Sequence, residues 1–334
     1  MKAVVVCELG TLNGVSYTDW PDPTPGPGAV LIAVEAIETN YPDMLVVEGR
    51  YQKRPPLPFV PGKGAAGRVV AVGAGVVGFE LGQRVATQVE YGAYAEKLCV
   101  PAATCYPVPD GIGAVEATAA VLAYQTAWFA LTDRAAMRAG ENVLVLGAAG
   151  GVGIAAIQLA KALGAGRVIA ATRGTAKHEA LARSGADAIL DTDRPDLREA
   201  LRRDVHALTD GRGVDIVIDP VGGALFEPAL RCLAWRGRLV VIGFAGGEIP
   251  TVKANYLLLK NIAVTGLQAS DYRDRDPALT VEAQAEIFRH IAEGAFRPVI
   301  GAVLPLARFR KALDALRDGR AVGKIVLVTE GAAA

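Results

Sequence analysis

A glycine-rich turn at residues 147–153, with the sequence Gly-Ala-Ala-Gly-Gly-Val-Gly, constrains the fold of this 334-residue chain more than any other feature. The turn follows an apolar run at 143–146 and opens a helical pattern over 154–163. Glycines at such a strand–turn–helix junction let the backbone turn tightly and present helix N-terminal N–H groups to a pyrophosphate. Ala148 replaces the first glycine of the usual fingerprint, but the context is complete, so the pattern favours dinucleotide binding over a purely structural turn.

Apolar runs alternate with helical patterns from about residue 122 to residue 266. The runs that predict strands are at 143–146, 167–171, 188–190, 214–219, 238–242 and 262–265. Short apolar strands separated by helices are typical of the buried parallel strands of a doubly wound sheet. We therefore expect an α/β protein with a Rossmann domain in this region.

The remainder of the chain has a different pattern. Up to about residue 121, Pro and Gly interrupt short β-like pieces at 3–7, 29–36, 55–62, 67–73 and 84–88, which predicts a small barrel or partly open β domain. The tail ends in a predicted strand at 324–328 and repeats apolar residues at helical spacing: Val281, Ala285, Phe288 and Ala292, then Phe309, Leu313 and Leu316. Because this segment is too short to be a domain, we expect it to pack against the N-terminal part.

Charge and composition exclude several classes of protein. The chain has 35 Lys and Arg against 35 Asp and Glu, so it lacks the basic excess of a general nucleic-acid binder or of a protein held on anionic lipid. No run of about 18 apolar residues predicts a membrane helix, and the apolar start is too short for a signal sequence. The four cysteines lack CxxC spacing and are expected to be reduced, buried thiols. We expect a cytoplasmic protein with a small-molecule partner, and neither nucleic acid nor a membrane as partner.

The end of the second Rossmann strand indicates which nicotinamide cofactor binds. An acidic residue about 20 residues after the glycines would bond the ribose 2′-OH of NAD. This chain has Thr172 and Arg173 there, with Lys177 shortly after, a hydroxyl and two cations suited to the 2′-phosphate of NADP. The alternative is a solvated helix start with chance cations.

Chemistry at a nicotinamide needs a hydride acceptor that is polarised by a metal or by hydrogen-bond donors. The three histidines, at 178, 206 and 290, fall within predicted helices and have no Cys or Glu at ligand spacing, so we expect no metal. Polar side chains gather instead in two patches, residues 39–43 with 49–51, and residues 124–126. An equal alternative is that Tyr41 and Tyr124 are core aromatics and that Asp43 caps a turn.

Motifs spread along the chain carry a family resemblance. They are Met-Lys-Ala-Val-Val-Val at 1–6, Asn-Tyr-Pro-Asp at 40–43 with Gly49 and Tyr51, Pro61-Gly62 with Ala66-Gly67, Tyr-Ala-Glu at 94–96, Thr126, the glycine-rich turn with Gln-Leu-Ala-Lys at 158–161, Ile-Gly-Phe at 242–244, Gly-Arg at 319–320 and Gly-Lys-Ile-Val-Leu at 323–327. In order and spacing the chain resembles the zinc-independent quinone oxidoreductase branch of the medium-chain dehydrogenase/reductase superfamily, which includes the zeta-crystallin-like proteins.

This resemblance implies a GroES-like catalytic domain built from residues 1–121 and 267–334, and a Rossmann domain from residues 122–266 that binds NADPH. It also implies a homodimer formed by edge pairing of the Rossmann sheets. The implied cofactor-binding residues are Asn40, Thr126, Ala149, Gly150, Gly151, Val152, Gly153, Thr172, Arg173, Lys177, Val221, Gly243, Phe244, Ala245, Leu267, Gln268 and Arg320.

Zinc ligands of the wider superfamily are missing here. Zinc-dependent relatives have a cysteine near Thr39 or Asn40, a Gly-His-Glu where residues 62–64 read Gly-Lys-Gly, and a four-cysteine lobe after the region of Val89. The resemblance therefore implies a metal-free site.

The chain also departs from the quinone reductases. Leu45 and Gly64 stand where these enzymes often have a tyrosine and an acidic or hydroxyl residue, which implies an altered substrate pocket. Asp191 and Thr192 stand where a tyrosine or histidine often stacks near the adenosine, which implies weaker cofactor binding.

The implied function is NADPH-dependent reduction of quinones or of α,β-unsaturated carbonyl compounds, with Tyr51 and Asn40 stabilising or protonating the developing oxyanion. A related alternative is reduction of an enoyl thioester, for which Arg50, Lys53 and Arg54 would form a basic rim for the CoA phosphate. A non-catalytic NADPH-binding or RNA-binding role, attached to some zeta-crystallin-like relatives, is the alternative from another class, and zero net charge argues against RNA.

Overall fold

A computed structural model describes residues 1–332 and divides the chain into two compact units. The β unit comprises Met1–Gln125 and the chain from Ser270 onward, and the Rossmann unit comprises Thr126–Ala269. The domain boundaries predicted from the sequence fall after residues 121 and 266. They state which parts of the chain fold independently, and they remain a prediction. Each unit is described below by itself.

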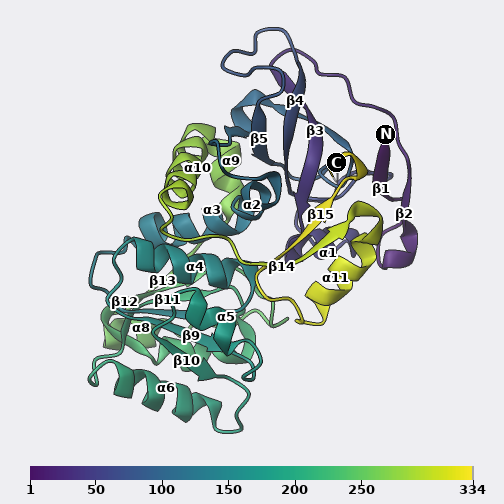
Figure 1. Cartoon of the computed structure of the whole chain (residues 1–334). Helices are drawn as coiled ribbons and strands as arrows, with labels where there is room; N and C mark the ends of the chain where they lie inside the picture. Colours follow the sequence, from purple (N-terminus) through teal and green to yellow (C-terminus); the bar gives the residue numbers. More distant parts are fainter. Residues whose placement is uncertain (333–334) are drawn as a thin grey trace. The chain divides into compact units, whose positions relative to one another are not determined.

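Six parallel strands form the sheet of the Rossmann unit, in the order β10-β9-β8-β11-β12-β13 (Figure 1). Their bounds are β8 Val143–Leu146, β9 Val168–Thr172, β10 Ala188–Asp191, β11 Val214–Asp219, β12 Leu233–Val241 and β13 Ala263–Gly266. Every residue of β8 is buried, as expected for a strand covered on both faces. The predicted doubly wound sheet is confirmed, and its strand order reverses between β8 and β11, where such folds open a ligand crevice.

Helices cover both faces of this sheet: α4 lies on one face and α6 on the opposite face (Figure 1). The helices of the unit are α4 Gly151–Ala162, α5 His178–Arg183, α6 Leu197–Leu208, α7 Phe226–Leu230 and α8 Ala254–Lys260. Helix α4 is buried along most of its length: eight of its residues, from Gly153 to Ala160, are buried, and all of them except Gln158 are apolar or glycine. The glycine-rich turn is thereby fixed between a buried strand and a buried helix.

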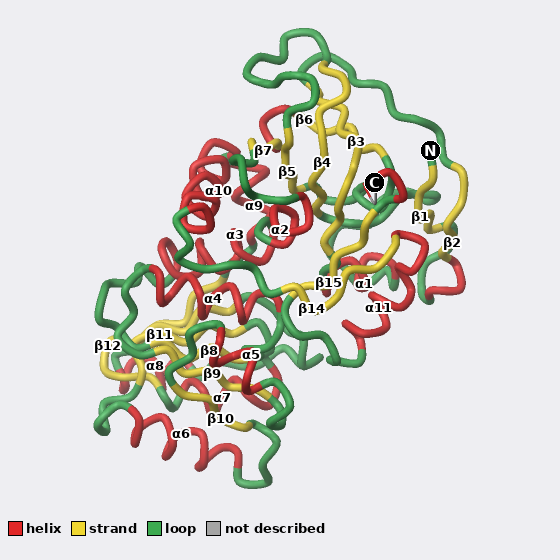
Figure 2. The backbone as a smooth tube through the Cα atoms, viewed as in Figure 1, coloured by secondary structure: helices red, strands yellow, loops and turns green. Residues whose placement is uncertain are grey.

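The β unit is built around one sheet, antiparallel except for the parallel pair β14–β15, in which β3, β4 and β15 lie side by side (Figure 2). The order is β14-β15-β3-β4-β5-β7, with β6 also paired to β3. The bounds are β3 Ala29–Glu38, β4 Gly64–Val72, β5 Arg84–Gln88, β6 Lys97–Pro101, β7 Cys105–Pro107, β14 Ile300–Pro305 and β15 Lys324–Val328, and β1 Lys2–Val6 pairs separately with β2 Val15–Asp19. Pairing of β15 with β3 confirms that the tail packs against the N-terminal part.

Helices of the β unit include α1 Tyr41–Val47, α2 Ala114–Ala119, α10 Pro277–Ala292 and α11 Phe309–Arg317, while α3 Leu122–Phe129 and α9 Ala269–Arg275 cross the unit boundaries. The two helices predicted in the tail are confirmed as α10 and α11. The predicted apolar face of α10 is wrong except at Phe288: Val281, Ala285 and Ala292 are exposed, and Ile287 and Ile291 are buried instead.

Two further expectations are wrong. Residues 55–62 form no strand, because four of the eight are proline and lack the N–H that a strand ladder needs; Phe59 makes only an isolated bridge with Val6. All four cysteines are free, as expected, but Cys7 is exposed and Cys99 is half-buried, so only Cys105 and Cys232 are buried. No helix among residues 1–332 is long and apolar enough to cross a membrane.

Candidate active site

The glycine-rich turn uses its glycines for two different purposes. An added Cβ at Gly153 would lie 2.6 Å from the Cα and the carbonyl oxygen of Ala148, so only glycine lets α4 start this close to the turn. At Gly150, the residue that precedes α4, an added Cβ would meet only the carbonyl oxygen of Gly147, at 3.4 Å. Gly153 is therefore required by packing, whereas Gly150 leaves open space in front of the helix N-terminus, where the first N–H groups of any helix lack helical partners.

The end of β9 carries the predicted 2′-phosphate residues. Thr172 is buried, Arg173 is exposed and Lys177 is half-buried just before α5. Burial, followed by the charge of Arg173, lowers the pKa of Lys177, so the two cations lie close enough to repel each other. An anion between them would relieve that repulsion. The glycine-rich turn is hydrogen-bonded to β9, since the Ala148 N–H donates to the Ala171 carbonyl at 3.1 Å.

Asp191, at the end of the neighbouring strand β10, organises this loop. Its Oδ1 accepts hydrogen bonds from the backbone N–H groups of Gly174 at 2.8 Å and Asp193 at 2.9 Å, and these bonds lower its pKa. From the sequence, Asp191 was expected only to replace a residue that stacks near the adenosine. In the structure its carboxylate is the support of the loop that carries Arg173.

The remaining predicted cofactor residues of this unit follow β11, β12 and β13. Asp219, fully buried at the end of β11, accepts from the N–H groups of Val221 at 2.9 Å and Gly222 at 2.8 Å. This loop contacts the one after β12, because the Ala245 N–H donates to the Pro220 carbonyl at 3.2 Å. The predicted residues Val221, Gly243, Phe244, Ala245, Leu267 and Gln268 thus lie with the glycine-rich turn at the carboxyl edge of the parallel sheet; Phe244 and Gln268 are exposed and Leu267 is buried.

In the β unit, Asn40 and Asp43 lie at the start of α1. Asn40 precedes the helix, and its backbone N–H donates to Asp43 Oδ2 at 2.8 Å. The same oxygen accepts from the Tyr94 hydroxyl at 3.1 Å, and Asp43 is buried. Burial raises the pKa of Asp43 to about 6, although the nearby Lys63 opposes that rise. Asp43 therefore acts as the cap of α1, one of the two readings left open by the sequence.

A buried ion pair supports the side chain of Asn40. Lys324, the first residue of β15, places its Nζ 2.6 Å from Glu38 Oε2, and both side chains are buried. The same ammonium donates to Asn40 Oδ1 and to the Thr39 carbonyl, the latter at 3.2 Å. Glu38 also explains Gly64: a Cβ at that position would lie 2.3 Å from Glu38 Oε1, so the glutamate occupies the space that a larger residue would need.

Tyr51 lies beneath a second buried lysine. The Nζ of Lys63 is 4.2 Å from the centroid of the Tyr51 ring and forms an ion pair of 2.7 Å with Glu90 Oε1. Glu90 also pairs with the buried Arg273, through its other oxygen, at 3.1 Å. A cation over the face of a phenol ring is attracted to the ring and stabilises negative charge on it. Lys63 thus holds the ring of the predicted catalytic tyrosine in place.

The second polar patch proves less suited to chemistry. Tyr124 is buried and stacks on Phe296 with ring centroids 5.4 Å apart, so it is a core aromatic. Gln125 Nε2 donates to Gln284 Oε1 at 2.9 Å inside the β unit. Thr126 is buried in α3, at the start of the Rossmann unit.

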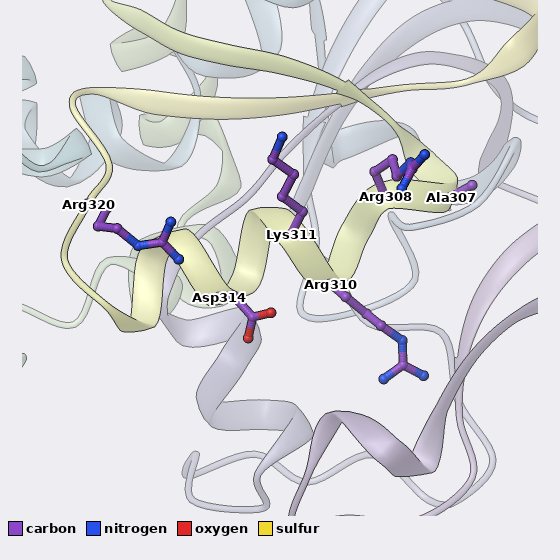
Figure 3. A pocket seen from close by; sticks show the side chains of 6 residues that line it. All are labelled: Ala307, Arg308, Arg310, Lys311, Asp314 and Arg320. Carbon is purple, nitrogen blue, oxygen red and sulfur yellow. The ribbon is translucent and has the colours of Figure 1, made fainter.

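Arg320, the last predicted cofactor residue, lines a cavity of about 340 Å³ in the β unit together with Ala307, Arg308, Arg310, Lys311 and Asp314. Figure 3 shows Lys311 and Arg310 pointing to opposite sides of α11. Arg320 pairs with Asp318 at 2.7 Å, and Arg310 donates to the carbonyls of Leu12 and Val15. The cavity is cationic, but its charges do not converge on one point.

Apart from Thr126 in α3 and Arg320 beside α11, the predicted site residues thus form one group at the sheet edge of the Rossmann unit and one around α1 in the β unit. Four supporting residues were missed as functional candidates: Glu38, Asp191, Asp219 and Lys324. Each is a charged residue at the end of a strand, a signal too common to be selective in a sequence. Lys63 was noted only as a replacement for a zinc ligand. Within residues 1–332 no three His, Cys, Asp or Glu side chains come together to hold a metal.

Comparison with known families agrees with this architecture. Residues 26–110 match the family described as the alcohol dehydrogenase GroES-like domain, and residues 151–284 match the family described as zinc-binding dehydrogenase. A GroES-like domain joined to a parallel six-stranded Rossmann sheet is the arrangement of medium-chain dehydrogenases/reductases.

Individual relatives narrow the class. Quinone oxidoreductase-like protein 2 from Mus musculus is 35% identical over 302 residues, which are 90% of this chain and 85% of that protein. Among solved structures, a mycobacterial protein complexed with NADPH is 35% identical with a TM-score of 0.90, covering 98% of this chain and 100% of that one. The Escherichia coli quinone oxidoreductase, also complexed with NADPH, is 27% identical with a TM-score of 0.90 and the same coverage. The chain belongs to the quinone oxidoreductase-like branch of this enzyme superfamily.

Proposed function

We propose that this protein is an NADPH-dependent, metal-free reductase of quinones or α,β-unsaturated carbonyl compounds. The observation that carries the proposal is that Arg173 directly follows β9 and Lys177 directly precedes α5, two cations in one loop of a chain whose relatives are solved with NADPH. The 2′-phosphate distinguishes NADPH from NADH, and two adjacent cations favour the cofactor that brings more negative charge.

The residues of the Rossmann unit fit such a cofactor. Gly150 leaves space before the N-terminus of α4 for the pyrophosphate, and Gly151, Val152 and Gly153 supply N–H groups there. Ala149, Val221, Gly243, Phe244, Ala245, Leu267 and Gln268 complete the proposed binding edge, with Asn40, Thr126 and Arg320 as further contacts. When bound, NADPH supplies a hydride to the electrophilic carbon of the substrate.

The β unit supplies the proposed donors to the substrate oxygen. Tyr51 carries a phenol hydroxyl and lies against Lys63, while the buried Asn40 presents an amide. Either group stabilises an oxyanion as it forms, and the tyrosine also has a proton to give. The metal-free reading follows from donor chemistry: where zinc enzymes have a histidine, this chain has Lys63, an ammonium already paired with Glu90.

Of the alternatives, an enoyl-CoA substrate is less favoured by the charges near Tyr51. Two of the three cations expected to form a phosphate rim are already paired, Arg50 with Glu48 at 3.0 Å and Lys53 with Asp274. A non-catalytic NADPH-binding or RNA-binding protein would have no need of the contact between Tyr51 and Lys63. We retain a neutral quinone or enone as the proposed substrate.

The proposed homodimer uses the free edge of the Rossmann sheet. Strand β13 ends the sheet, and Trp235, Leu258 and Leu259 on neighbouring elements are each more than 70% exposed. An unpaired strand edge beside exposed apolar side chains favours association with a second copy. Sedimentation analysis should give a dimer, and Trp235→Glu with Leu258→Glu should give a monomer.

A single screen tests the catalytic proposal. Quinones, enones and enoyl-CoA thioesters are offered with NADPH or NADH, and cofactor consumption is followed by absorbance. The proposal expects turnover of quinones or enones and tighter use of NADPH. Turnover confined to enoyl-CoA would favour the thioester alternative. NADPH binding without turnover of any acceptor would favour the non-catalytic one.

A further inference from the structure

The side chain of Asn40 is held at one end and free at the other. Its Oδ1 accepts a hydrogen bond from the Lys324 ammonium, whereas its Nδ2 is buried and has no acceptor among the described residues. Asn40 is only 7% exposed, so water cannot freely satisfy that N–H₂ group. A buried amide donor left without a partner is costly, and such groups often await a ligand.

Lys324 determines which end of the amide is free. An ammonium has three donors and no acceptor, so it can bond only to the amide oxygen and repels the amide N–H₂. Two hydrogen bonds and one ion pair engage the ammonium: it donates to Asn40 Oδ1 and to the Thr39 carbonyl at 3.2 Å, and its Nζ lies 2.6 Å from Glu38 Oε2. The lysine therefore cannot turn away without losing its carboxylate partner. The orientation of Asn40 is fixed by residues 284 positions apart in the chain.

Stability alone gives a poor account of this arrangement. A buried ion pair often contributes little net stability, because removing both charges from water costs as much as their attraction returns. Here Lys324 also donates one hydrogen bond to the side chain of Asn40. Asn40 immediately precedes α1, the helix after which Tyr51 follows. Orientation of the Asn40 side chain explains this ion pair better than stability does.

We propose that Lys324, held by Glu38, is a positioning residue that fixes the amide of Asn40 so that Nδ2 donates a hydrogen bond to an oxygen of the bound ligand. The inference rests on the proposed function, in which Asn40 lies in the active site. The acceptor is an oxygen either of the cofactor or of the substrate, and the experiment below separates the two.

The amide itself can be observed without any catalysis. The chain has only five asparagines, at 13, 40, 142, 255 and 261, so protein labelled with ¹⁵N-asparagine gives few side-chain amide signals. Asn40→Asp identifies the signal of Asn40 by its loss. In ligand-free protein, the double variant Glu38→Gln/Lys324→Met should shift the Asn40 signal and speed its hydrogen exchange. This double variant is preferred because Lys324→Met alone would leave the Glu38 carboxylate buried and unpaired.

The functional arm uses Asn40→Asp as a matched variant. Aspartate keeps the shape and the oxygen that accepts from Lys324, but it replaces the Nδ2 donor by a second oxygen. We expect Asn40→Asp and Glu38→Gln/Lys324→Met each to weaken one ligand step by roughly three- to tenfold, the usual range for one hydrogen bond. A rise in the NADPH dissociation constant assigns the acceptor to the cofactor; a change in KM or kcat at saturating NADPH assigns it to the substrate. The triple variant should be no worse than Asn40→Asp, because Lys324 acts through Asn40.

The outcomes separate the two hypotheses. An unchanged Asn40 amide signal in the double variant overturns the positioning role, as do losses that multiply in the triple variant. A shifted signal with unchanged NADPH affinity and unchanged kinetics also overturns it, because the orientation then has no consequence for a ligand. If wild-type protein turns over no quinone or enone, the proposed function fails, while the NADPH titration of the variants still tests the positioning of Asn40.

Discussion

The Rossmann unit and the β unit support their proposed ligand groups differently. In the Rossmann unit these groups are main-chain N–H groups, glycines and cations at an exposed sheet edge, and Asp191 and Asp219 hold the loops. In the β unit they are the side chains of Asn40 and Tyr51, each contacted by a buried lysine. The comparison suggests that the first unit binds through local backbone shape and the second acts through buried charges brought from distant strands.

The largest expected effect tests the side-chain chemistry of the β unit. Tyr51→Phe keeps the ring beneath Lys63 and removes the hydroxyl, so kcat/KM for an enone should fall by about 10²- to 10³-fold, the cost of losing one oxyanion donor. Quinones are reduced more readily without proton assistance, so their loss should be smaller. The NADPH dissociation constant should stay within about twofold of wild type. Undiminished enone turnover would make Tyr51 a wall of the pocket.

The second-largest expected effect is a pH dependence of stability that arises from a buried carboxyl group in the β unit. Asp43 has a pKa raised by burial to about 6, above its unfolded value, so the folded state binds its proton more tightly. Stability from this proton is complete below about pH 4 and is lost as pH rises through about 6, by roughly 3 kcal/mol. Asp43→Asn should remove that loss. Urea unfolding at several pH values would show the variant gaining on wild type from pH 4 to 7; a constant difference would contradict the assignment.

Two glycines of the turn offer a matched pair in the Rossmann unit. Gly153→Ala places a Cβ 2.6 Å from backbone atoms of Ala148 and should lower the free energy of unfolding by about 1–3 kcal/mol, as overpacking does. Gly150→Ala meets only one oxygen at 3.4 Å, so it should leave stability unchanged and weaken NADPH binding. Thermal unfolding and NADPH titration check both. Equal destabilisation by the two variants would show that the turn is purely structural.

The cofactor preference depends on exposed cations and should respond less. Arg173→Ala should reduce the preference for NADPH over NADH by about 1–3 kcal/mol, the value of a charge-assisted hydrogen bond. The control is Arg183→Ala, which removes an exposed cation of α5 that pairs with Glu179. Dissociation constants for both cofactors give the result. Equal affinities of wild-type protein for NADPH and NADH would refute the preference.

The last prediction is that removing metal ions changes neither activity nor stability. Lys63 and Asn40 stand where zinc relatives have ligands and are engaged with Glu90 and Lys324, so a chelator should alter neither the activity nor the unfolding temperature. Elemental analysis of the purified protein should find no stoichiometric zinc. About one equivalent of zinc, or activity lost in chelator and restored by zinc, would overturn the metal-free mechanism.

The difference between local backbone shape in the Rossmann unit and long-range side-chain contacts in the β unit also explains which features could be predicted from the sequence. Strands β8 and β11 were predicted to the residue, because they are short, mostly apolar and each adjoins one glycine, Gly147 after β8 and Gly213 before β11. The first half of β12 was missed, since its Arg236-Gly237-Arg238 segment breaks the apolar pattern, with Arg236 at φ +65. The cofactor motifs are contiguous and therefore visible.

Around α1 the sequence predicted Asn40 and Tyr51 but not the residues that hold them. The Lys324–Asn40 contact joins residues 284 positions apart, and one sequence gives no signal for such a pair. Glu38 lies at the end of an apolar strand, where a charged residue usually marks only the return to solvent. Its burial follows from pairing of β3 with β15, which is a property of the sheet.

The position of Lys324 also bears on how the protein is made. The ribosome releases residues 38–40 nearly 300 residues before the lysine that orients them, whereas the whole Rossmann unit, Thr126–Ala269, emerges in one piece and earlier than β15. At about 5–20 residues per second, the Glu38 carboxylate waits at least roughly 15 seconds for its partner. During synthesis the Rossmann unit is therefore complete first, and Asn40 in the β unit gains its buried lysine only when β15 is added.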